Sequence, residues 1–279
     1  MNTLVLGGQP WTTDDAIFAR LKEIGYDGVE LPIFEGTPAD YSALGKRLDA
    51  IGLERTFVTI IPDETTNPIS PDPDVRENAK RRLEWALECG NAVGATLMCG
   101  PWHSPLGVFS GDGATDDELH RLEEVHRHTA ERAEEAGIQL SLEAVNRFEC
   151  YAKNTMAQLA DHAARIDHRN FGVMYDTFHA NIEECDPIAA FTDHAQWINH
   201  VHISENDRGI PGRGHIDFEA TIGAIRHSGY DGWLTVEAFG RTIPTLAAAT
   251  RIWRDLFPDH DTLFVESHEL IRRYWEEAA

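Results

Sequence analysis

Four polar residues end or follow short apolar runs of the sequence, and together they could hold a metal ion. Glu143 ends "QLSLE", Asp176 follows "FGVMY", His202 lies in "NHVHIS" and Glu237 ends "WLTVE". Any one of them could be a strand-end side chain held by a hydrogen bond. Three carboxylates close together, however, would repel one another unless a cation lay between them. Oxygen ligands with one nitrogen and no thiolate favour Mn²⁺, Co²⁺ or Mg²⁺ over a structural zinc.

These residues need a scaffold that brings the ends of successive strands together. Short apolar runs alternate with longer segments of helical periodicity, which is typical of a parallel sheet built from βαβ units. The predicted strands are Leu4–Gly7, Gly28–Leu31, Glu54–Ile60, Ala95–Cys99, Gln139–Glu143, Phe171–Tyr175, Ile198–Ile203 and Trp233–Glu237. The predicted helices include Thr13–Ile24, Ala39–Ile51, Asp74–Cys89, Asp116–Ala136 and Phe218–His227.

Eight strand–helix units predict one α/β domain over residues 1–279, a single (β/α)8 TIM barrel. An extra C-terminal helix is predicted from His260 to Ala279. An open doubly wound sheet is the alternative, but no predicted strand is followed by a GxGxxG turn. In a barrel, catalytic groups lie at the C-terminal ends of the strands, so we expect the four polar residues to converge there.

Further polar and aromatic residues follow the same strand ends. Glu149, His179 and Arg208 come after the fifth, sixth and seventh predicted strands. Trp102 and Phe239 could line an apolar wall of a small site. Each has a plainer interpretation, because histidines are often held by hydrogen bonds and aromatic residues near strand ends often serve packing alone.

Four motifs give the sequence a recognisable pattern. They are "LEAVNRFE" (142–149), "YDTFHANIEE" (175–184), "HVHISENDRGIPGRGHIDF" (200–218) and "GYDGWLTVEAF" (229–239), and "CGPWHSPLG" (99–107) extends the pattern backwards. Their order and spacing resemble the ketose 3-epimerases, the D-tagatose/D-psicose 3-epimerase group of the sugar isomerase/epimerase TIM-barrel superfamily.

The resemblance implies a set of site residues and a reaction. The implied metal ligands are Glu143, Asp176, His202 and Glu237, with Mn²⁺ as the expected ion and Co²⁺ or Mg²⁺ as alternatives. Glu143 and Glu237 would also be the acid/base pair for epimerisation of a free ketose at C3 through an enediolate. The resemblance further implies that Glu149, His179 and Arg208 bind the reacting end of the sugar.

Other functions remain open from the sequence. An aldose–ketose or hydroxypyruvate-type isomerase, or a C-glycoside deglycosylase, would use a similar barrel. A non-catalytic sugar-binding protein would need no base on each face of its ligand, which the pair Glu143 and Glu237 argues against. The first predicted strand, "LVLGGQPWT", lacks the aromatic-rich segment expected of the family, and so the identity of the ketose is left open.

The charge of the chain restricts its partners. Lys and Arg total 24 against 47 Asp and Glu, a net charge of −23, which excludes the cationic surface that nucleic acids require. No segment is apolar enough to span a membrane, and the opening residues lack the features of a signal peptide. We expect a soluble cytoplasmic protein with reduced cysteines, a small-molecule sugar substrate and a homo-oligomeric state, either a dimer or a tetramer.

The same charge suggests either a halophilic source or an ordinary acidic cytosolic protein. If repulsion among the acidic residues limits stability, the melting temperature should rise as KCl increases from low to molar concentration, because salt screens that repulsion. A thermal unfolding series in KCl measures this. A flat or falling melting temperature would remove the halophile hypothesis.

Overall fold

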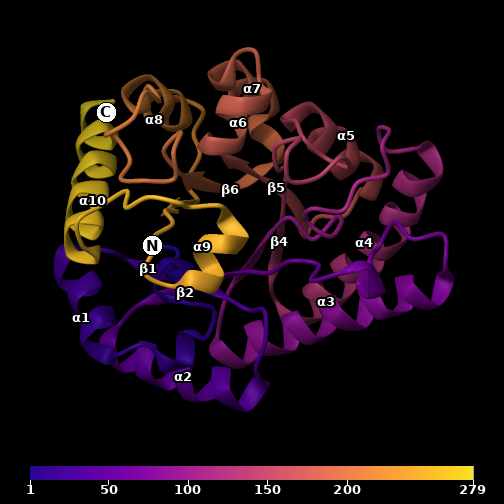
Figure 1. The fold of residues 1–279 in the computed structure, drawn as a ribbon, viewed down its shortest axis with the longest axis horizontal. Coiled ribbons are helices and arrows are strands. Elements are labelled where there is room, and N and C mark those ends of the chain that lie inside the picture. Colours follow the sequence, from indigo (N-terminus) through magenta and orange to yellow (C-terminus); the bar gives the residue numbers. More distant parts are fainter. Residues whose placement is uncertain (279) are drawn as a thin grey trace.

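The structure is a computed structural model that describes residues 1–278. Its strands form one parallel sheet in chain order, and the sheet curls into a nearly closed barrel with the helices outside it (Figure 1). The strands are β1 (Gly28–Pro32), β2 (Glu54–Val58), β3 (Leu97–Gly100), β4 (Gln139–Glu143), β5 (Phe171–Asp176), β6 (Ile198–Ile203) and β7 (Trp233–Val236). The predicted TIM-barrel fold is therefore confirmed.

Residues 1–2 bridge the gap between β7 and β1. Asn2 pairs with Glu30 in an isolated parallel bridge. The Asn2 amide donates to the Val236 carbonyl at 2.8 Å, and the Glu30 amide donates to the Met1 carbonyl at 2.9 Å. A two-residue segment thus takes the place of an eighth regular strand.

The predicted strand over Leu4–Gly7 is wrong, because Thr3–Leu6 form the 3₁₀ helix η1. The Asn2 side chain accepts a hydrogen bond from the Leu4 amide and starts the turn, and the Gly7 amide donates to the Leu4 carbonyl and ends it. A short apolar run does not by itself distinguish a buried strand from another buried segment. The other seven predicted strands are confirmed, with ends displaced by at most two residues.

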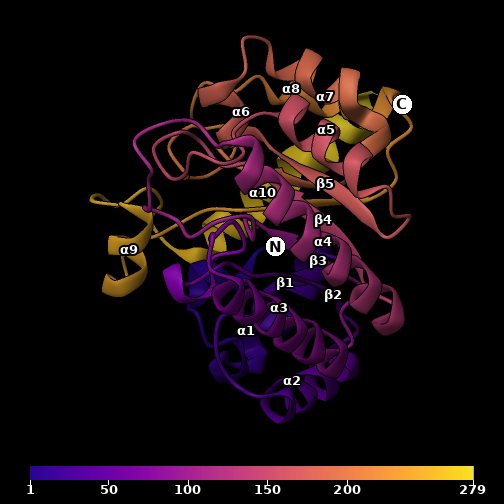
Figure 2. The same ribbon diagram turned by 90° about the vertical axis from the view of Figure 1, so that its right-hand side faces the viewer.

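The helices surround the barrel, and α9 projects to the side in Figure 2. They are α1 (Asp15–Ile24), α2 (Pro38–Ile51), α3 (Pro73–Val93), α4 (Asp116–Ala136), α5 (Met156–Ile166), α6 (Thr177–Glu183), α7 (Pro187–His194), α8 (Phe218–His227), α9 (Pro244–Thr250) and α10 (His260–Glu277). The five predicted internal helices and the C-terminal helix are confirmed, although Ala279 lies outside the described residues. Within residues 1–278, no helix has the length and apolar character needed to cross a membrane.

Local signals explain where the helices begin and end. At the start of α4, Thr115 and Glu118 form a capping box in which each side chain bonds the other residue's backbone amide. Gly137 follows α4 in the left-handed conformation, at a φ of 70°, which glycine adopts without steric cost. The predicted bounds of α4 were correct because both end signals are visible in the sequence.

A pair of buried histidines joins α4 to α5. His126 Nδ1 lies 2.8 Å from His162 Nε2, and His126 Nε2 lies 3.3 Å from the Trp102 carbonyl oxygen. A carbonyl only accepts, so His126 carries its proton on Nε2 and accepts from His162 through Nδ1. Burial lowers the pKa of both rings well below the ordinary histidine value of 6.5. Both rings are therefore neutral in the folded protein.

This pair should make the protein less stable in mild acid. Below pH 6.5 the unfolded chain binds protons that the buried rings do not, so the free energy of unfolding falls by about 1.4 kcal/mol per histidine for each further pH unit. Urea unfolding at several pH values between neutral and mildly acidic measures the slope. His162→Gln, which keeps an N–H donor toward His126, should reduce the slope by the contribution of one histidine, and an unchanged slope would contradict this assignment.

Candidate functional site

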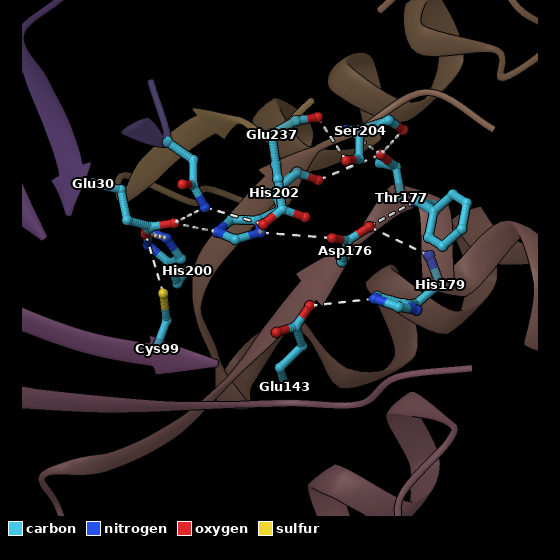
Figure 3. A network of polar contacts seen from close by, with 12 residues as sticks. Glu30, Cys99, Glu143, Asp176, Thr177, His179, His200, His202, Ser204 and Glu237 are labelled. Carbon is cyan, nitrogen blue, oxygen red and sulfur yellow. Dashed lines mark hydrogen bonds and ion pairs between the residues drawn. The ribbon is translucent and has the colours of Figure 1, made fainter. Parts of the chain in front are cut away.

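The four predicted ligand residues lie at one end of the barrel, each from a different strand. Glu143 and Asp176 are the last residues of β4 and β5, His202 is the fifth of six residues in β6, and Glu237 directly follows β7. Asp176 and His202 are register partners on neighbouring strands. Figure 3 shows the four side chains pointing toward a common centre.

The distances among these side chains fit a cation site. Ligand atoms of Glu143, Asp176 and His202 all lie within 4.8 Å of one another. His202 Nδ1 lies 3.5 Å from Asp176 Oδ2 and 3.5 Å from Glu237 Oε1. Glu237 is therefore close to His202 but is not part of the group of three whose ligand atoms all lie within 4.8 Å of one another. His202 Nδ1 is buried and has no hydrogen-bond partner, so it is available to a metal ion.

Arg208 supplies the positive charge nearest to these carboxylates. Its Nη1 atom donates to Asp176 Oδ2 at 3.2 Å, to Glu237 Oε2 at 2.5 Å and to Ser204 Oγ at 2.9 Å. One guanidinium cannot balance three buried carboxylates, and a divalent cation would supply the missing charge. The donor set therefore fits a hard divalent ion.

The carboxylates of the site differ in their affinity for protons. Burial raises the pKa of Glu143 well above its ordinary value, and the charges of Glu237 and Asp176 raise it further. Burial acts in the same direction on Asp176, but Arg208, His179 and His202 together outweigh it and hold the pKa of that carboxyl below its usual range. Glu143 is therefore better suited than Asp176 to exchange a proton near neutral pH.

His179 faces Glu143 from the start of α6. Burial, with the nearby Arg208 charge, lowers the pKa of His179 to about 3, so the ring is neutral. Its Nδ1 accepts a hydrogen bond from the Asn146 amide at 3.0 Å, and its Nε2 lies 2.9 Å from Arg208 Nη2, a group that only donates. His179 Nε2 lies 3.5 Å from Glu143 Oε1. The neutral His179 ring therefore lies between the Arg208 guanidinium and the Glu143 carboxyl group.

A cavity of about 500 Å³ opens beside the charged cluster. Glu149, Arg208 and Phe178 line it. The Arg208 guanidinium lies 3.8 Å from the centre of the Phe178 ring and 5.0 Å from that of Phe239. Phe178 belongs to the motif "YDTFH" but was not singled out from the sequence, because one aromatic residue at the start of a helix gives no specific signal. Trp253, also in the lining, is 70% exposed.

The structure places Trp102 away from the lining of this cavity. Its ring is fully buried and packs against His126 and Phe171, with ring centres 4.5 and 5.6 Å away. A substrate contact by Trp102 stays a prediction, while packing explains its position. The other proposed substrate residues lie near one another, since Asn146 Nδ2 donates to Glu149 Oε1 at 2.7 Å and also lies 3.0 Å from His179 Nδ1.

Comparison with known proteins places this site in a family. The family model described as "Xylose isomerase-like TIM barrel" matches residues 18–273. The chain belongs to this family. Its relatives include a ketose 3-epimerase of Arthrobacter globiformis, 32% identical over 91% of this chain and 88% of the relative. A probable ketose 3-epimerase of Synechocystis is 29% identical over 94% and 91% of the two chains.

Solved structures support the same relationship for this family member. A structure of L-ribulose 3-epimerase superposes with a TM-score of 0.89 at 30% identity, covering 97% of this chain and 93% of that one. A D-psicose 3-epimerase from Clostridium cellulolyticum H10, solved with D-tagatose, gives 0.88 at 27% identity over 99% and 98%. The resemblance seen in the sequence is confirmed, and with it an enzyme of the isomerase class.

One residue important to the geometry was missed from the sequence. Glu30, in the middle of β1, is fully buried and accepts hydrogen bonds from His200 and His202 at 2.7 Å each. The signal was a glutamate inside the apolar run "GVELP". The cost of burying a carboxylate, which drew attention to Glu143, applies equally here.

The role of Arg208 in balancing charge can be tested on the metal-free protein. Arg208→Ala should lower the free energy of unfolding by about 3–5 kcal/mol near neutral pH, since it leaves buried carboxylates without a partner. Arg241→Ala is the matched control, because Arg241 pairs with Asp255 at the surface and its loss should change stability little. Urea unfolding measures both variants. Equal effects would show that Arg208 does not hold the cluster together.

Proposed function

We propose that this protein epimerises a free ketose at C3 with a divalent metal ion and two carboxylates. The observation that carries the proposal is the placement of Glu143 and Glu237 on different strands around His202 and Asp176, beside a cavity of about 500 Å³. Relatives named ketose 3-epimerase, D-psicose 3-epimerase and L-ribulose 3-epimerase support it.

The metal would be held by Glu143, Asp176, His202 and Glu237, and Mn²⁺ is the ion we propose. When bound, such an ion polarises the C2 and C3 oxygens of a ketose and lowers the pKa of the C3 proton. Arg208 neutralises Asp176 and Glu237 in the absence of the ion, and its guanidinium could then turn toward the substrate. Either Arg208 or the divalent ion would thus supply positive charge to the same carboxylates.

Proton transfer would be divided between the two glutamates. One carboxylate takes the proton from C3 on one face of the sugar, which leaves an enediolate. The other carboxyl group returns a proton to the opposite face, and C3 is inverted. The raised pKa of Glu143 suits a group that alternates between base and acid, since transfer is most effective when the pKa lies near the working pH.

The remaining polar residues would hold the reacting end of the sugar. Arg208, which contacts His179 Nε2 through Nη2 at 2.9 Å, would stabilise oxygens on which negative charge develops, and His179 would hold the guanidinium in place. Glu149 lines the same cavity and would accept a hydroxyl hydrogen. Phe178 and Phe239 flank Arg208 and would give the sugar an apolar wall.

Turnover in D₂O tests this assignment. The chelated protein should be inactive on a ketohexose panel, Mn²⁺ should restore turnover, and the product should carry deuterium at C3 but not at C1. A 1,2-isomerase would label C1 or C2 instead. Mass spectrometry and NMR of the product locate the label, and deuterium at C1 would refute C3 epimerisation.

Single variants test the division between the two carboxylates. Glu143→Gln and Glu237→Gln should each abolish epimerisation, while each retains exchange of the C3 proton in only one of the two epimers, the one that its remaining carboxylate faces. Metal content must be measured in both, because each residue is also a proposed ligand. Loss of preference for either epimer in two metal-replete variants would contradict the two-base assignment.

A further inference from the structure

The carboxylate of Glu30 lies beneath the metal-ligand residues, on the side of His202 away from Asp176 (Figure 3). It is completely buried and receives five hydrogen bonds. The donors are Asn2 Nδ2 at 3.0 Å, Thr56 Oγ1 at 3.0 Å, Cys99 Sγ at 3.1 Å, His200 Nε2 at 2.7 Å and His202 Nε2 at 2.7 Å. A carboxylate offers about four acceptor sites, so these donors use its full capacity.

These partners determine where the protons lie. The amide, hydroxyl and thiol groups all donate to Glu30, so the carboxylate accepts on both oxygens and is ionised. His200 and His202 then each present Nε2–H to Glu30. If Glu30 were protonated, its O–H hydrogen would face the hydrogen of one of these donor groups.

This arrangement fixes the orientation of His202. With Nε2–H bound to Glu30 Oε1, the opposite nitrogen Nδ1 points at Asp176 and Glu237, 3.5 Å from an oxygen of each. We propose that Glu30 is a positioning residue that holds His202 so that Nδ1 binds the catalytic metal ion. A histidine that donates its other N–H to a carboxylate is also a more basic ligand.

A second connection runs from Glu30 to Glu237 through Asn2. The Asn2 side-chain amide donates to Glu30 Oε1 and to Glu237 Oε1, at 3.0 Å in both cases. The backbone of Asn2 is itself fixed between β1 and β7. Glu30 therefore supports two of the four proposed ligands from below, one directly and one through an amide.

Glu30, Cys99, His200 and His202 could also be considered as a second metal site, because their ligand atoms lie within 4.8 Å of one another. The contacts favour hydrogen bonding instead. The Cys99 thiol and both imidazoles meet the Glu30 carboxylate at ordinary hydrogen-bond distances. A metal ion would have to displace those protons and separate the groups. The proposal thus requires one ion per chain.

The proposal rests on the proposed function, and metal affinity tests it without an activity assay. Glu30→Gln keeps the size of the side chain but turns an NH₂ group toward hydrogen-bond donors. Mn²⁺ affinity, measured from the EPR signal of free Mn²⁺ during titration, should fall about 10- to 100-fold. Thr56→Val is the matched control, because it removes a donor to the far oxygen, Oε2, and should bind Mn²⁺ as tightly as the wild type.

The outcomes separate the two proposals. A wild-type protein that binds no Mn²⁺ would refute the metal-dependent function itself. One Mn²⁺ in the wild type, with equal affinity in a folded Glu30→Gln variant, would overturn only the role of Glu30, as would two ions per wild-type chain. Circular dichroism establishes whether each variant is folded.

A further test is measured on the wild type, and a variant serves only to assign the signal. In histidine-¹⁵N-labelled protein loaded with diamagnetic Zn²⁺, the His202 ring should keep its proton on Nε2 and bind the ion through Nδ1. The signal is assigned by its absence from His202→Asn. Coordination through Nε2 would overturn the proposal.

Discussion

The balance of charge at the C-terminal end of the barrel is the constraint on which the site depends. Glu30, Glu143, Asp176 and Glu237 are all buried within a few residues of the strand ends, where an unpaired carboxylate would be costly. Two arrangements relieve the cost: donors surround Glu30 from below, and Arg208 enters from above. The remaining deficit of positive charge is what makes the upper cluster attractive to a cation.

The loop that carries Arg208 is held in shape by its own buried side chain, Glu205. The buried Glu205 side chain accepts hydrogen bonds from the backbone amides of Asn206, Gly212 and Ile216, so the loop folds around its own carboxylate. Gly214 passes so close that a Cβ atom there would lie 2.4 Å from Glu205 Oε1. Arg208 itself has a φ of 65°, an uncommon conformation for a residue with a side chain. Arg208 thus adopts an unfavourable backbone conformation, in which its guanidinium contacts Asp176 and Glu237.

The sequence was informative where function coincides with the end of a strand. Glu143, Asp176 and Glu237 could be found because each interrupts an apolar run at its end, and a barrel brings such ends together. Glu30 lies in the middle of the apolar run "GVELP". Burying its carboxylate costs as much, but a search for polar residues at strand ends does not find it. Trp102 had an ambiguous position, because an aromatic residue near a strand end serves packing or binding equally well.

The segment that bridges β7 and β1 could not be predicted for a different reason. The run after Asn2 carries an apolar signal, yet its turn depends on the Asn2 side chain, and the bridge across the gap depends on β1 and β7. Local patterns contain no information on such distant pairing. Helices α4 and α8, whose signals are local, were predicted with correct bounds.

The contact between Asn2 and Glu237 joins residues 235 positions apart. Because the strands pair in chain order, β7 is the last strand to become available during synthesis. Bringing residues so far apart in the sequence together costs chain entropy, which the contacts then formed must offset. A nascent chain that ends before β7 holds Glu143, Asp176 and His202 without Glu237, and Asn2 has no second edge to join. Glu237 therefore joins the other three residues only when β7 has paired with β6 and with Asn2.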